Sequence, residues 1–560
     1  MLEIIREIID CDVLICGGGM AGLMAAIAAA DGGASVVVAE KANALRSGDG
    51  VGGNDHFLCY IPQCHHDLEE WMREFKASQS GKFQDDSIQR VFARRVYEVV
   101  QDWEKWGINM RTGPDNSYIF LGHAFPDRMR IHLKYDGKNQ KAVLCREARK
   151  RGVRIVNRTP ITEFLTADSG RIIGAMGVDI SETTPRIRLF RAKAVITATG
   201  SVNRVYPGMT PASLFNVPGC PANTGLGMTA AYRAGASIVN IEMAGASAGP
   251  KYFSRAGKGT WIGVFRYADG KPLGPFVTQP TKELGDITCD IWPTVFNEKA
   301  KDGSGPIYVD CTGISQEDYE YMLWAFTCEG DTSLLEAMEQ QGIDLRRHMP
   351  EFGGYGASQL DRGVQIDEHA ATDVPGLFAA GDEVGNFSGH MAGAATMGRV
   401  AGESAAAYVR AVPPTEQDLS ALPAVREKLS FYSALMERQN GSHWSELNRA
   451  VQQLMDDYAG ISKLRSETML TAGYKYLGDL RRRAEQEVSC ANAHELMRAL
   501  ESFELLDTGK LICVAALERK ESRANHRRSD YTFTSPLMDD KFVVVRKTPS
   551  GPKASLRKIH

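Results

Sequence analysis

The strongest chemical signal in the sequence is a glycine pattern near its beginning. Gly17, Gly19 and Gly22 follow the apolar run 13–15 and open an alanine-rich stretch, 23–30. Glycines at this spacing allow a tight strand-to-helix turn, close approach of a pyrophosphate to the backbone, and tight packing of the helix on the strand. The pattern predicts a dinucleotide site with the phosphates at the helix N-terminus.

An acidic residue completes this predicted unit. Glu40 follows a second apolar run, 35–39, and lies 18 residues beyond Gly22. A carboxylate at about this place binds the ribose hydroxyls of a dinucleotide, and it argues against a 2′-phosphate. At this point both FAD and NAD are compatible with the pattern.

A second glycine cluster follows in ALRSGDGVGGNDHF, residues 44–57. Four of the six positions from Gly48 to Gly53 are glycine, which is more than a simple turn needs. Such a loop indicates that the backbone passes close to a large ligand.

Two later segments favour FAD over NAD. Residues 191–200, RAKAVITATG, and residues 374–382, VPGLFAAGD, each predict a strand that ends in small residues. A dinucleotide fold that brings a strand from near residue 380 back to a site near residue 17 is typical of FAD-binding proteins.

The motifs together resemble the flavoprotein of the succinate dehydrogenase and fumarate reductase superfamily. The resemblance rests on GGGMAG with Glu40, ATG at 198–200, GLFAAGD at 376–382, and RKESRANHRRSDY at 519–531. The last of these is similar to a superfamily signature, R-x-ESR-x-x-H-x-R-x-D. The four matches occur in the expected order and span nearly the whole chain.

The resemblance implies an α/β fold with a split FAD-binding, Rossmann-like domain of the glutathione-reductase type, residues 1–205 and 355–410. An α+β capping domain, 206–354, is inserted over the flavin, and a helical C-terminal domain, 411–560, ends in a basic tail that we expect to be solvated. Helical periodicity over 424–456 and 463–504 agrees with the last assignment.

The predicted FAD contacts come from these motifs. They are Gly17, Gly19, Met20, Ala21, Gly22, Glu40, Lys41, Ser47, Gly52, Gly53, Ile161, Ala198, Thr199, Gly200, Gly381, Asp382, Ala395 and Thr396.

Within the superfamily, the chain departs from the dicarboxylate enzymes. Those enzymes carry an R-S-H-T run whose histidine bonds covalently to the flavin, whereas this chain has Gly48 at that position. FAD is therefore expected to be non-covalent. Ala394 occupies the position of the arginine that clamps a substrate carboxylate, so fumarate and succinate are disfavoured.

The chain is more similar to the alpha subunit of adenylylsulfate reductase. RSG at 46–48, GNFSGH at 385–390 and GPIYVD at 305–310 match that branch. The resemblance implies a ferredoxin-like partner subunit that carries the iron–sulfur clusters, and hence a hetero-oligomer. Two other interpretations stay open: a stand-alone enzyme that reduces a C=C substrate other than a dicarboxylate, and an electron-transfer flavoprotein within a larger complex.

Positive charge near the flavin would stabilise a small anionic substrate. The catalytic candidates are His390, in a glycine-flanked loop, and Lys251 and Arg255 from the capping segment. Arg362 and Arg399 are interpreted as structural, as is the charged cluster at 519–528. No metal is predicted, since the adjacent His65 and His66 would point apart.

Composition excludes several classes of function. The 560 residues carry a formal net charge of -4, and 65 Lys and Arg are spread along the chain, which does not indicate nucleic acid binding. The eleven cysteines form no C-x-x-C and no compact quartet, so no iron–sulfur ligand set is expected in this chain. Charged residues at the start and glycines within 13–30 predict no signal peptide and no membrane span, and therefore a cytoplasmic protein.

Overall fold

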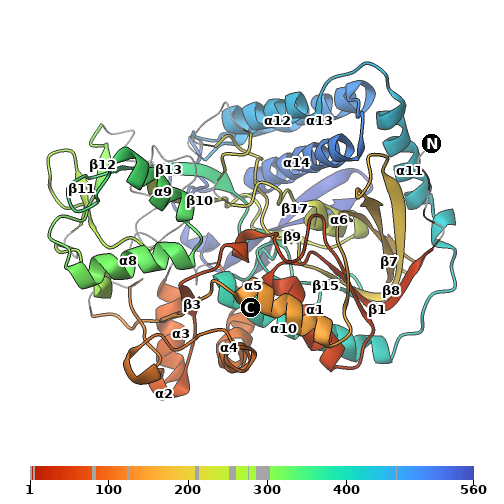
Figure 1. The fold of residues 1–560 in the computed structure, drawn as a ribbon. Helices are drawn as coiled ribbons and strands as arrows, with labels where there is room; N and C mark the ends of the chain where they lie inside the picture. The colour runs from red at the N-terminus through yellow and green to blue at the C-terminus, as the bar shows by residue number, and fades with distance from the viewer. Residues whose placement is uncertain are drawn as a thin grey trace.

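The computed structural model describes residues 3, 5, 7–78, 83–122, 127–208, 214–217, 219–250, 260–274, 277–285, 303–461 and 463–560. Figure 1 shows a large body with a smaller cap, drawn in green, that projects from one side. The chain enters the cap from the body near residue 245 and returns near residue 358.

A seven-stranded sheet forms the centre of the body. Its strands run in the order β5-β2-β1-β8-β7-β6, with β15 also paired to β8. Their bounds are β5 Arg154–Val156, β2 Val36–Ala39, β1 Ile9–Cys16, β8 Arg186–Thr197, β7 Ile172–Asp179, β6 Ile161–Thr166 and β15 Leu377–Ala379. β1 is parallel to β2 and β8, and β15 is parallel to β8. The strand near residue 380 thus returns to the N-terminal unit, as the sequence predicts.

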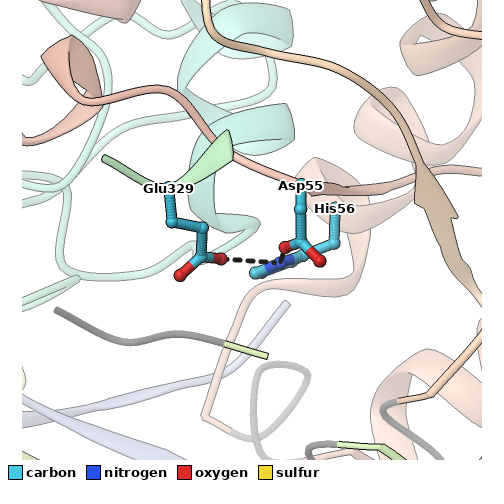
Figure 2. Close-up of side chains that lie close together, drawn as sticks. All are labelled: Asp55, His56 and Glu329. Atoms are coloured by element: carbon cyan, nitrogen blue, oxygen red, sulfur yellow. Dashed lines mark hydrogen bonds and ion pairs between the residues drawn. The ribbon is translucent and has the colours of Figure 1, made fainter. Parts of the chain in front are cut away.

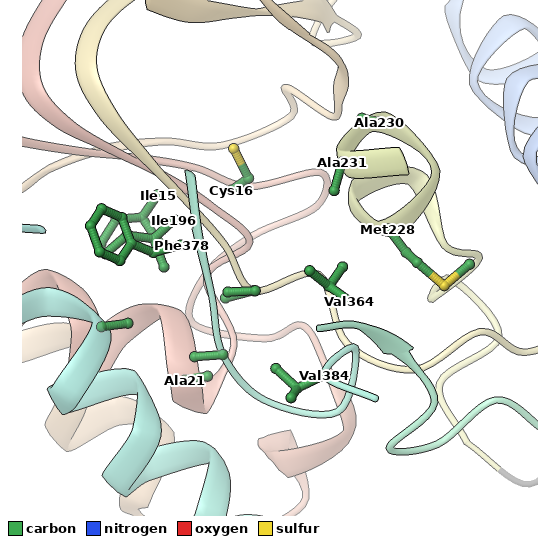
Figure 3. Packing of buried hydrophobic residues seen from close by; sticks show 14 of the residues in the cluster. Ile15, Cys16, Ala21, Ile196, Met228, Ala230, Ala231, Val364, Phe378 and Val384 are labelled. Carbon is green, nitrogen blue, oxygen red and sulfur yellow. The ribbon is translucent and has the colours of Figure 1, made fainter. Parts of the chain in front are cut away.

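Apolar side chains explain why these strands lie in the interior. Ile15, Ile196 and Phe378, from β1, β8 and β15, lie beside one another in Figure 3 and are at most 4% exposed. Strands buried on both faces are typical of parallel sheets covered by helices. Each large side chain buried in this way stabilises the fold by about 1.5–3 kcal/mol.

Helices cover the sheet. α1 (Met20–Asp31) follows β1, α10 (His390–Arg410) follows β15, and the two helices pack against each other through small residues. A Cβ built at Gly398 would lie 2.3 Å from the Ala21 carbonyl oxygen, and one at Gly402 would lie 2.3 Å from that of Ala25. Only glycine lets the two helix backbones come this close.

The remaining elements of the body form two smaller sheets and several helices. They are β3 (His56–Leu58) paired with β4 (His132–Lys134), β14 (Gly363–Val364), β9 (Ile238–Val239), α2 (Pro62–His65), α3 (Leu68–Ala77), α4 (Asp86–Trp106), α5 (Gln140–Lys150) and α6 (Leu226–Ala234).

The cap has its own sheet and core. Its strands run in the order β10 (Gly245–Pro250), β13 (Glu351–Ser358), β12 (Ile307–Asp310) and β11 (Val264–Tyr267), with α8 (Gln316–Cys328) and α9 (Thr332–Gln341) beside them. Trp261, Phe326 and Phe352 are central to a separate buried apolar cluster. β10 carries the chain out of the body and β13 carries it back, so this antiparallel pair is the hinge of the cap.

The observed cap is smaller than the predicted segment 206–354. Met228, Ile238 and Ala244 belong to the core of the body. The sequence between residue 206 and β10 shows no clean periodicity, so its packing could not be predicted from pattern alone.

The C-terminal region is helical, with one exception. Its helices are α11 (Pro423–Glu437), α12 (Trp444–Ala459), α13 (Glu467–Glu487) and α14 (Ala493–Glu518). Beyond them, β16 (Lys541–Thr548) and β17 (Gly551–Lys558) form a hairpin, and β16 pairs with β9. The basic stretch expected to be a solvated tail is therefore largely a strand of this hairpin. None of the described helices has the length and apolar character needed to cross a membrane.

The contact between α1 and α10 generates the first prediction. Gly402→Ala should destabilise the protein by about 1–3 kcal/mol because its methyl group meets the Ala25 backbone. Urea unfolding measures the difference. Gly478→Ala in α13 is the matched control, since a Cβ there meets only Arg482 Nη1 at 4.0 Å. The control should be neutral or slightly stabilising, and equal effects of the two changes would contradict the packing described.

Candidate active site

The glycine turn lies where β1, α1 and the end of β8 meet. Gly17 has φ +102°, and a Cβ there would lie 2.3 Å from the Ala198 carbonyl oxygen. At Gly22 a Cβ would lie 1.9 Å from the Gly17 oxygen. Around Gly19, by contrast, the nearest such contact is 4.0 Å away. Gly17 and Gly22 are thus required by packing, while Gly19 faces open space at the N-terminus of α1, as a phosphate site needs.

Glu40 directly follows β2, and its side chain contacts this turn. Its carboxylate accepts hydrogen bonds from the backbone N–H groups of Gly18 (2.7 Å) and Ala42 (2.8 Å), and the side chain is 6% exposed. Lys141 Nζ donates to the Gly18 carbonyl oxygen from the other side. The predicted ribose-binding carboxylate is therefore held rigidly next to the predicted phosphate site.

Two further predicted contacts lie close to Glu40. Ile161 opens β6, and Thr159, two residues before it, donates its N–H to the Glu40 carbonyl oxygen at 2.8 Å. The Lys41 ammonium points elsewhere, to Glu501 on α14 at 2.8 Å and to the Ala222 carbonyl. This ion pair gives Lys41 a role in joining the C-terminal helices to the body. Contact of either residue with FAD stays a prediction.

The glycine loop 48–53 has two different faces. Gly48 has φ +84°, and a Cβ there would meet only the Gly19 Cα, at 3.8 Å. This face is open toward the dinucleotide turn. Asp49 turns away from it: its carboxylate accepts from Asn223 Nδ2 at 3.0 Å and from the Cys220 N–H.

The other face of the loop meets the cap. A Cβ at Gly53, whose φ is +108°, would lie 2.0 Å from the Cys328 carbonyl oxygen. A Cβ at Gly52 would lie 2.8 Å from that of Glu329, and one at Gly330 would lie 2.9 Å from the Gly52 Cα. These glycines let the cap segment 328–330 rest directly on the loop. Their predicted contact with the flavin stays a prediction, but packing of the cap already requires glycine here.

Buried polar atoms without partners mark the space between these elements. Among the described residues, no hydrogen-bond partner reaches Ser47 Oγ, Thr396 Oγ1, Glu383 Oε1 or either side-chain amide atom of Gln359. Buried polar atoms are nearly always hydrogen-bonded, so such a group points to a ligand. FAD, with its phosphates, ribityl hydroxyls and ring edge, fits this set of donors and acceptors.

The remaining predicted contacts surround this space. Ala198, Thr199 and Gly200 follow β8, and Gly381 (φ +87°) follows β15. Their positions at the carboxyl ends of neighbouring parallel strands are where dinucleotides bind in such sheets. Met20 and Ala21 begin α1, and Ala395 and Thr396 lie in the second turn of α10.

A group of carboxylates distinguishes this site, and the sequence did not single out two of them, Glu383 and Asp361. Glu383 is fully buried, accepts a hydrogen bond from Thr199 Oγ1 at 2.6 Å, and has its pKa raised to about 7 by burial. Asp382, which was predicted, has its pKa raised well above its usual range by burial and by the carboxylates of Asp361 and Asp49. Asp361 is tied to the same segment because its N–H donates to the Asp382 carbonyl at 2.9 Å. The motif GDE marked only Asp382, because Glu383 has no fixed role in the pattern.

A second buried polar cluster joins the body to the cap (Figure 2). His56 Nδ1 lies 2.6 Å from Asp55 Oδ1 and 3.3 Å from Glu329 Oε1, and Glu329 belongs to the cap. Lys134 Nζ lies 3.0 Å from Asp55 Oδ2, which also accepts from the cap residue Thr260 at 2.7 Å. Burial opposes ionisation of Asp55, but the Lys134 ammonium and then the His56 ring hold the pKa of Asp55 well below its usual range.

The same cluster has the composition of a metal site. Ligand atoms of Asp55, His56 and Glu329 lie within 4.8 Å of one another. However, the Lys134 ammonium already contacts Asp55, and its charge opposes the entry of a cation. That this chain binds no metal stays a prediction. Sequence reasoning assigned no role to Asp55, Lys134 or Glu329, because these residues are far apart in the chain and share no motif.

Of the three predicted catalytic residues, only His390 lies within the described part of the chain. His390 is half-buried, begins α10 and has φ +51°, so the chain turns sharply into the helix at this residue. It begins the helix that follows the segment containing Asp382, and its catalytic role stays a prediction. Lys251 and Arg255 lie outside the described residues.

The C-terminal signature forms a buried ionic network. Arg519 Nε contacts Glu242 at 2.7 Å and Arg519 Nη1 contacts Glu521 at 2.9 Å, and all three side chains are fully buried. His526 Nδ1 faces the Arg465 guanidinium at 2.9 Å, and burial followed by that positive charge holds the pKa of His526 well below its usual range. The network joins α14 to the segment that leads into β10, which is a structural role, as expected.

A glycine-turn dinucleotide site, a strand that returns from residue 377, and a hinged cap resting on the glycine loop define a flavin-dependent oxidoreductase fold. Comparison with known proteins gives the same result. Residues 12–398 match the FAD binding domain family, and residues 448–552 match the family described as fumarate reductase flavoprotein C-term. The chain belongs to these families, and hence to the flavoproteins of the succinate dehydrogenase and fumarate reductase superfamily. It is an FAD-dependent oxidoreductase.

Individual relatives cover the full chain. One component of the fumarate reductase (CoM/CoB) of Methanothermobacter marburgensis is 26% identical, over 97% of this chain and 98% of that protein. The succinate dehydrogenase flavoprotein subunit of Bacillus subtilis is 22% identical, over 93% of this chain and 91% of that protein. Among solved structures, adenylylsulfate reductase from Archaeoglobus fulgidus has a TM-score of 0.85 at 23% identity and covers 100% of this chain and 98% of its own. The resemblance inferred from the motifs is thus confirmed at the level of the superfamily and the fold.

The buried cluster around Asp55 yields a prediction on stability. Lys134→Met should cost about 3–5 kcal/mol, because it leaves the Asp55 carboxylate buried without its cation. Chemical unfolding followed by tryptophan fluorescence measures the change. Lys138→Met is the matched control: its ammonium lies 3.6 Å from Asp136 in a largely exposed pair, which contributes about 0–1 kcal/mol. A similar loss in both variants would show that Lys134 does not stabilise the cluster.

Glu383 yields a prediction on pH. Its folded-state pKa is raised from 4.5 to about 7, so its contribution to stability is complete below pH 4.5 and is lost as the pH rises through 7. Glu383→Gln cannot ionise, and FAD-free variant protein should gain about 3 kcal/mol relative to the parent between these two pH values. Melting temperatures across this range measure the gain. The exposed Glu368→Gln should follow the parent at every pH, and a parallel pH profile for Glu383→Gln would contradict the assignment.

Proposed function

We propose that this chain is the flavoprotein subunit of a reductase that holds FAD without a covalent bond and exchanges electrons with an iron–sulfur partner protein. The observation that carries the proposal is the set of unpartnered buried polar atoms, Ser47 Oγ among them, together with the open face of the neighbouring Gly48. It supports a ligand with the size and polarity of FAD at a loop position that has no side chain for attachment.

FAD supplies a centre that accepts or donates two electrons. In this proposal the chain's own groups position it: Glu40 binds the ribose hydroxyls, and the α1 N-terminus and Gly19 face the pyrophosphate. The loop residue Ser47 and the α10 residue Thr396 donate to the cofactor. The cap excludes water by resting on the loop through Gly52 and Gly53.

The electron partner is inferred from what the chain contains. Ten cysteines are described, none of them in a disulfide, and they are spread over the body, the cap and the C-terminal helices. Cys289 lies outside the described residues. Within the described part of the chain there is also a single dinucleotide turn, at Gly17–Gly22, and it is assigned to FAD. A small ferredoxin-like partner bearing iron–sulfur clusters would carry electrons to or from the flavin. Relatives that are named as subunits support such a partner.

The substrate class is a small anion, as in the adenylylsulfate reductase branch. The segments 46–48, 305–310 and 385–390 support this branch, and Ala394 disfavours the carboxylate clamp of the dicarboxylate enzymes. His390 is the proposed polar group at the reacting centre. Lys251 and Arg255 are proposed as anion-binding groups from the cap.

Purification under anaerobic conditions from a native source tests the proposal. We expect the chain to retain FAD after mild extraction but to release it on acid denaturation, and to co-purify with a small polypeptide that contains iron and acid-labile sulfide. Reduction of adenylylsulfate by the complex would then be assayed with a reduced dye as the electron donor. A yellow protein without a partner that is reduced directly by NADH would overturn the electron-partner proposal, and FAD retained after denaturation would overturn the non-covalent one.

A further inference from the structure

The glycine loop 48–53 lies across the predicted phosphate site. A Cβ built at Gly48 would lie 3.8 Å from the Gly19 Cα, and one at Gly50 would lie 2.7 Å from Met20 Cγ. Met20 is the first residue of α1. The loop therefore covers the N-terminus of α1, which is where a helix binds the phosphates of a dinucleotide.

The cap lies on the other side of the same loop. The atoms nearest to a Cβ built at Gly52 all belong to the cap: the Glu329 carbonyl oxygen at 2.8 Å, the Glu329 carbonyl carbon at 3.6 Å and the Gly330 Cα at 3.6 Å. The dinucleotide turn, the loop and the cap segment 328–330 are thus stacked in that order. The loop cannot move away from the turn while the cap segment rests on it.

Glu329 fixes this segment of the cap by two contacts (Figure 2). Its backbone lies on Gly52, and its side-chain Oε1 lies 3.3 Å from His56 Nδ1. His56 is itself fixed in the body, because β3 pairs with β4 and because its Nδ1 lies 2.6 Å from Asp55 Oδ1. The Glu329 side chain is only 8% exposed. One residue of the cap therefore covers the loop and is attached just beyond its end.

We propose that Glu329 is a positioning residue of the cofactor site: it holds the cap on the glycine loop, and thereby the loop on the dinucleotide turn, so that FAD dissociates slowly while the cap rests there. The proposal deepens the proposed function and rests on it only in taking FAD to be bound without a covalent bond. Two coupled equilibria change each other by the same factor. Bound FAD therefore holds the cap on the body in turn.

The rate of FAD release tests the proposal. FAD-loaded protein is diluted into buffer without FAD, and free FAD is measured by filtration at timed intervals. We expect Glu329→Ala to release FAD at least about fivefold faster than the parent, because the attachment to His56 is lost. Glu329→Gln keeps an oxygen that faces His56 and should release FAD at nearly the parent rate. Glu336→Ala, at an exposed position of α9 in the cap, is the control and should not change the rate.

A change on the loop side tests the same contact independently. Gly52 has φ -70°, so its own backbone accepts alanine, and the added methyl group meets the cap first. Gly52→Ala should therefore also speed FAD release. Its effect and that of Glu329→Ala should add to less than their sum, because both loosen one contact. Gly478→Ala in α13 should leave the rate unchanged. Faster release in Gly52→Ala but not in Glu329→Ala would overturn the proposal, since Gly52 would then act through FAD and not through the cap.

Hydrogen exchange on the parent provides a test that needs no variant. Amides in peptides that contain the segment 328–330 should exchange more slowly in FAD-loaded than in FAD-free protein, relative to peptides from α13. Equal exchange in the two states would overturn the proposal even if Glu329→Ala failed to fold.

Failure of this proposal and failure of the proposed function give different results. FAD that stays attached after denaturation would overturn both the non-covalent bond and the role of Glu329. FAD that is released by denaturation, but leaves the parent and Glu329→Ala at equal rates, would overturn the role of Glu329 alone. None of these measurements requires a substrate or the iron–sulfur partner.

Discussion

The close approach of backbone to backbone between β8, the glycine turn and α1 sets the geometry on which the rest of the structure depends. The Ala198 carbonyl oxygen lies where a Cβ of Gly17 would have to be, and the Gly17 oxygen lies where a Cβ of Gly22 would have to be. Three chain segments therefore converge with no side chain between them. This convergence points the N-terminus of α1 at the open space in front of Gly19. In the same way, α10 comes close to the backbone of α1 because Gly398 and Gly402 have no side chains.

The cap is positioned by a different combination of forces. At the glycine loop, shape alone governs the contact, because segment 328–330 lies on Gly52 and Gly53 at a distance that no side chain allows. Next to it, Lys134 pairs with the buried Asp55 within the body, and His56 and Thr260 link Asp55 and its neighbours to the cap through contacts with Glu329 and Asp55. Buried ion pairs contribute little net stability compared with apolar contacts, but breaking one is expensive. These contacts therefore favour one position of the cap on the body more than they add to the stability of the fold.

The strands β10 and β13 connect the cap to the body next to the predicted flavin site. β10 and β13 leave the body side by side, and Arg362, which follows β13, donates from Nε to the carbonyl oxygen of Met243, which precedes β10. The ionic network of Glu242 and Arg519 anchors the same entry segment to α14. The C-terminal helices thus take part in holding the cap, although they contribute no residue to the sheet.

The sequence by itself determined the dinucleotide unit, the returning strand at 377–379 and the superfamily. Each depends on local rules: glycine at fixed spacing, apolar runs of strand length, and an acid at a set distance such as Glu40. The helical character of the C-terminal region was equally readable from its periodicity, because an amphipathic helix records its buried face in every turn. Only the tertiary structure decided where the cap begins, what the final basic stretch becomes, and which charges meet. The hairpin β16–β17 pairs with β9, which lies far away in the chain, and no local pattern encodes that partner. The same holds for the cluster around Asp55: Lys134 reaches it because β4 pairs with β3, and Glu329 reaches His56 because the cap folds back on the body. Glu383 shows the reason most directly: the identity of a charged residue is local, but its burial and its partners are properties of the assembled interior.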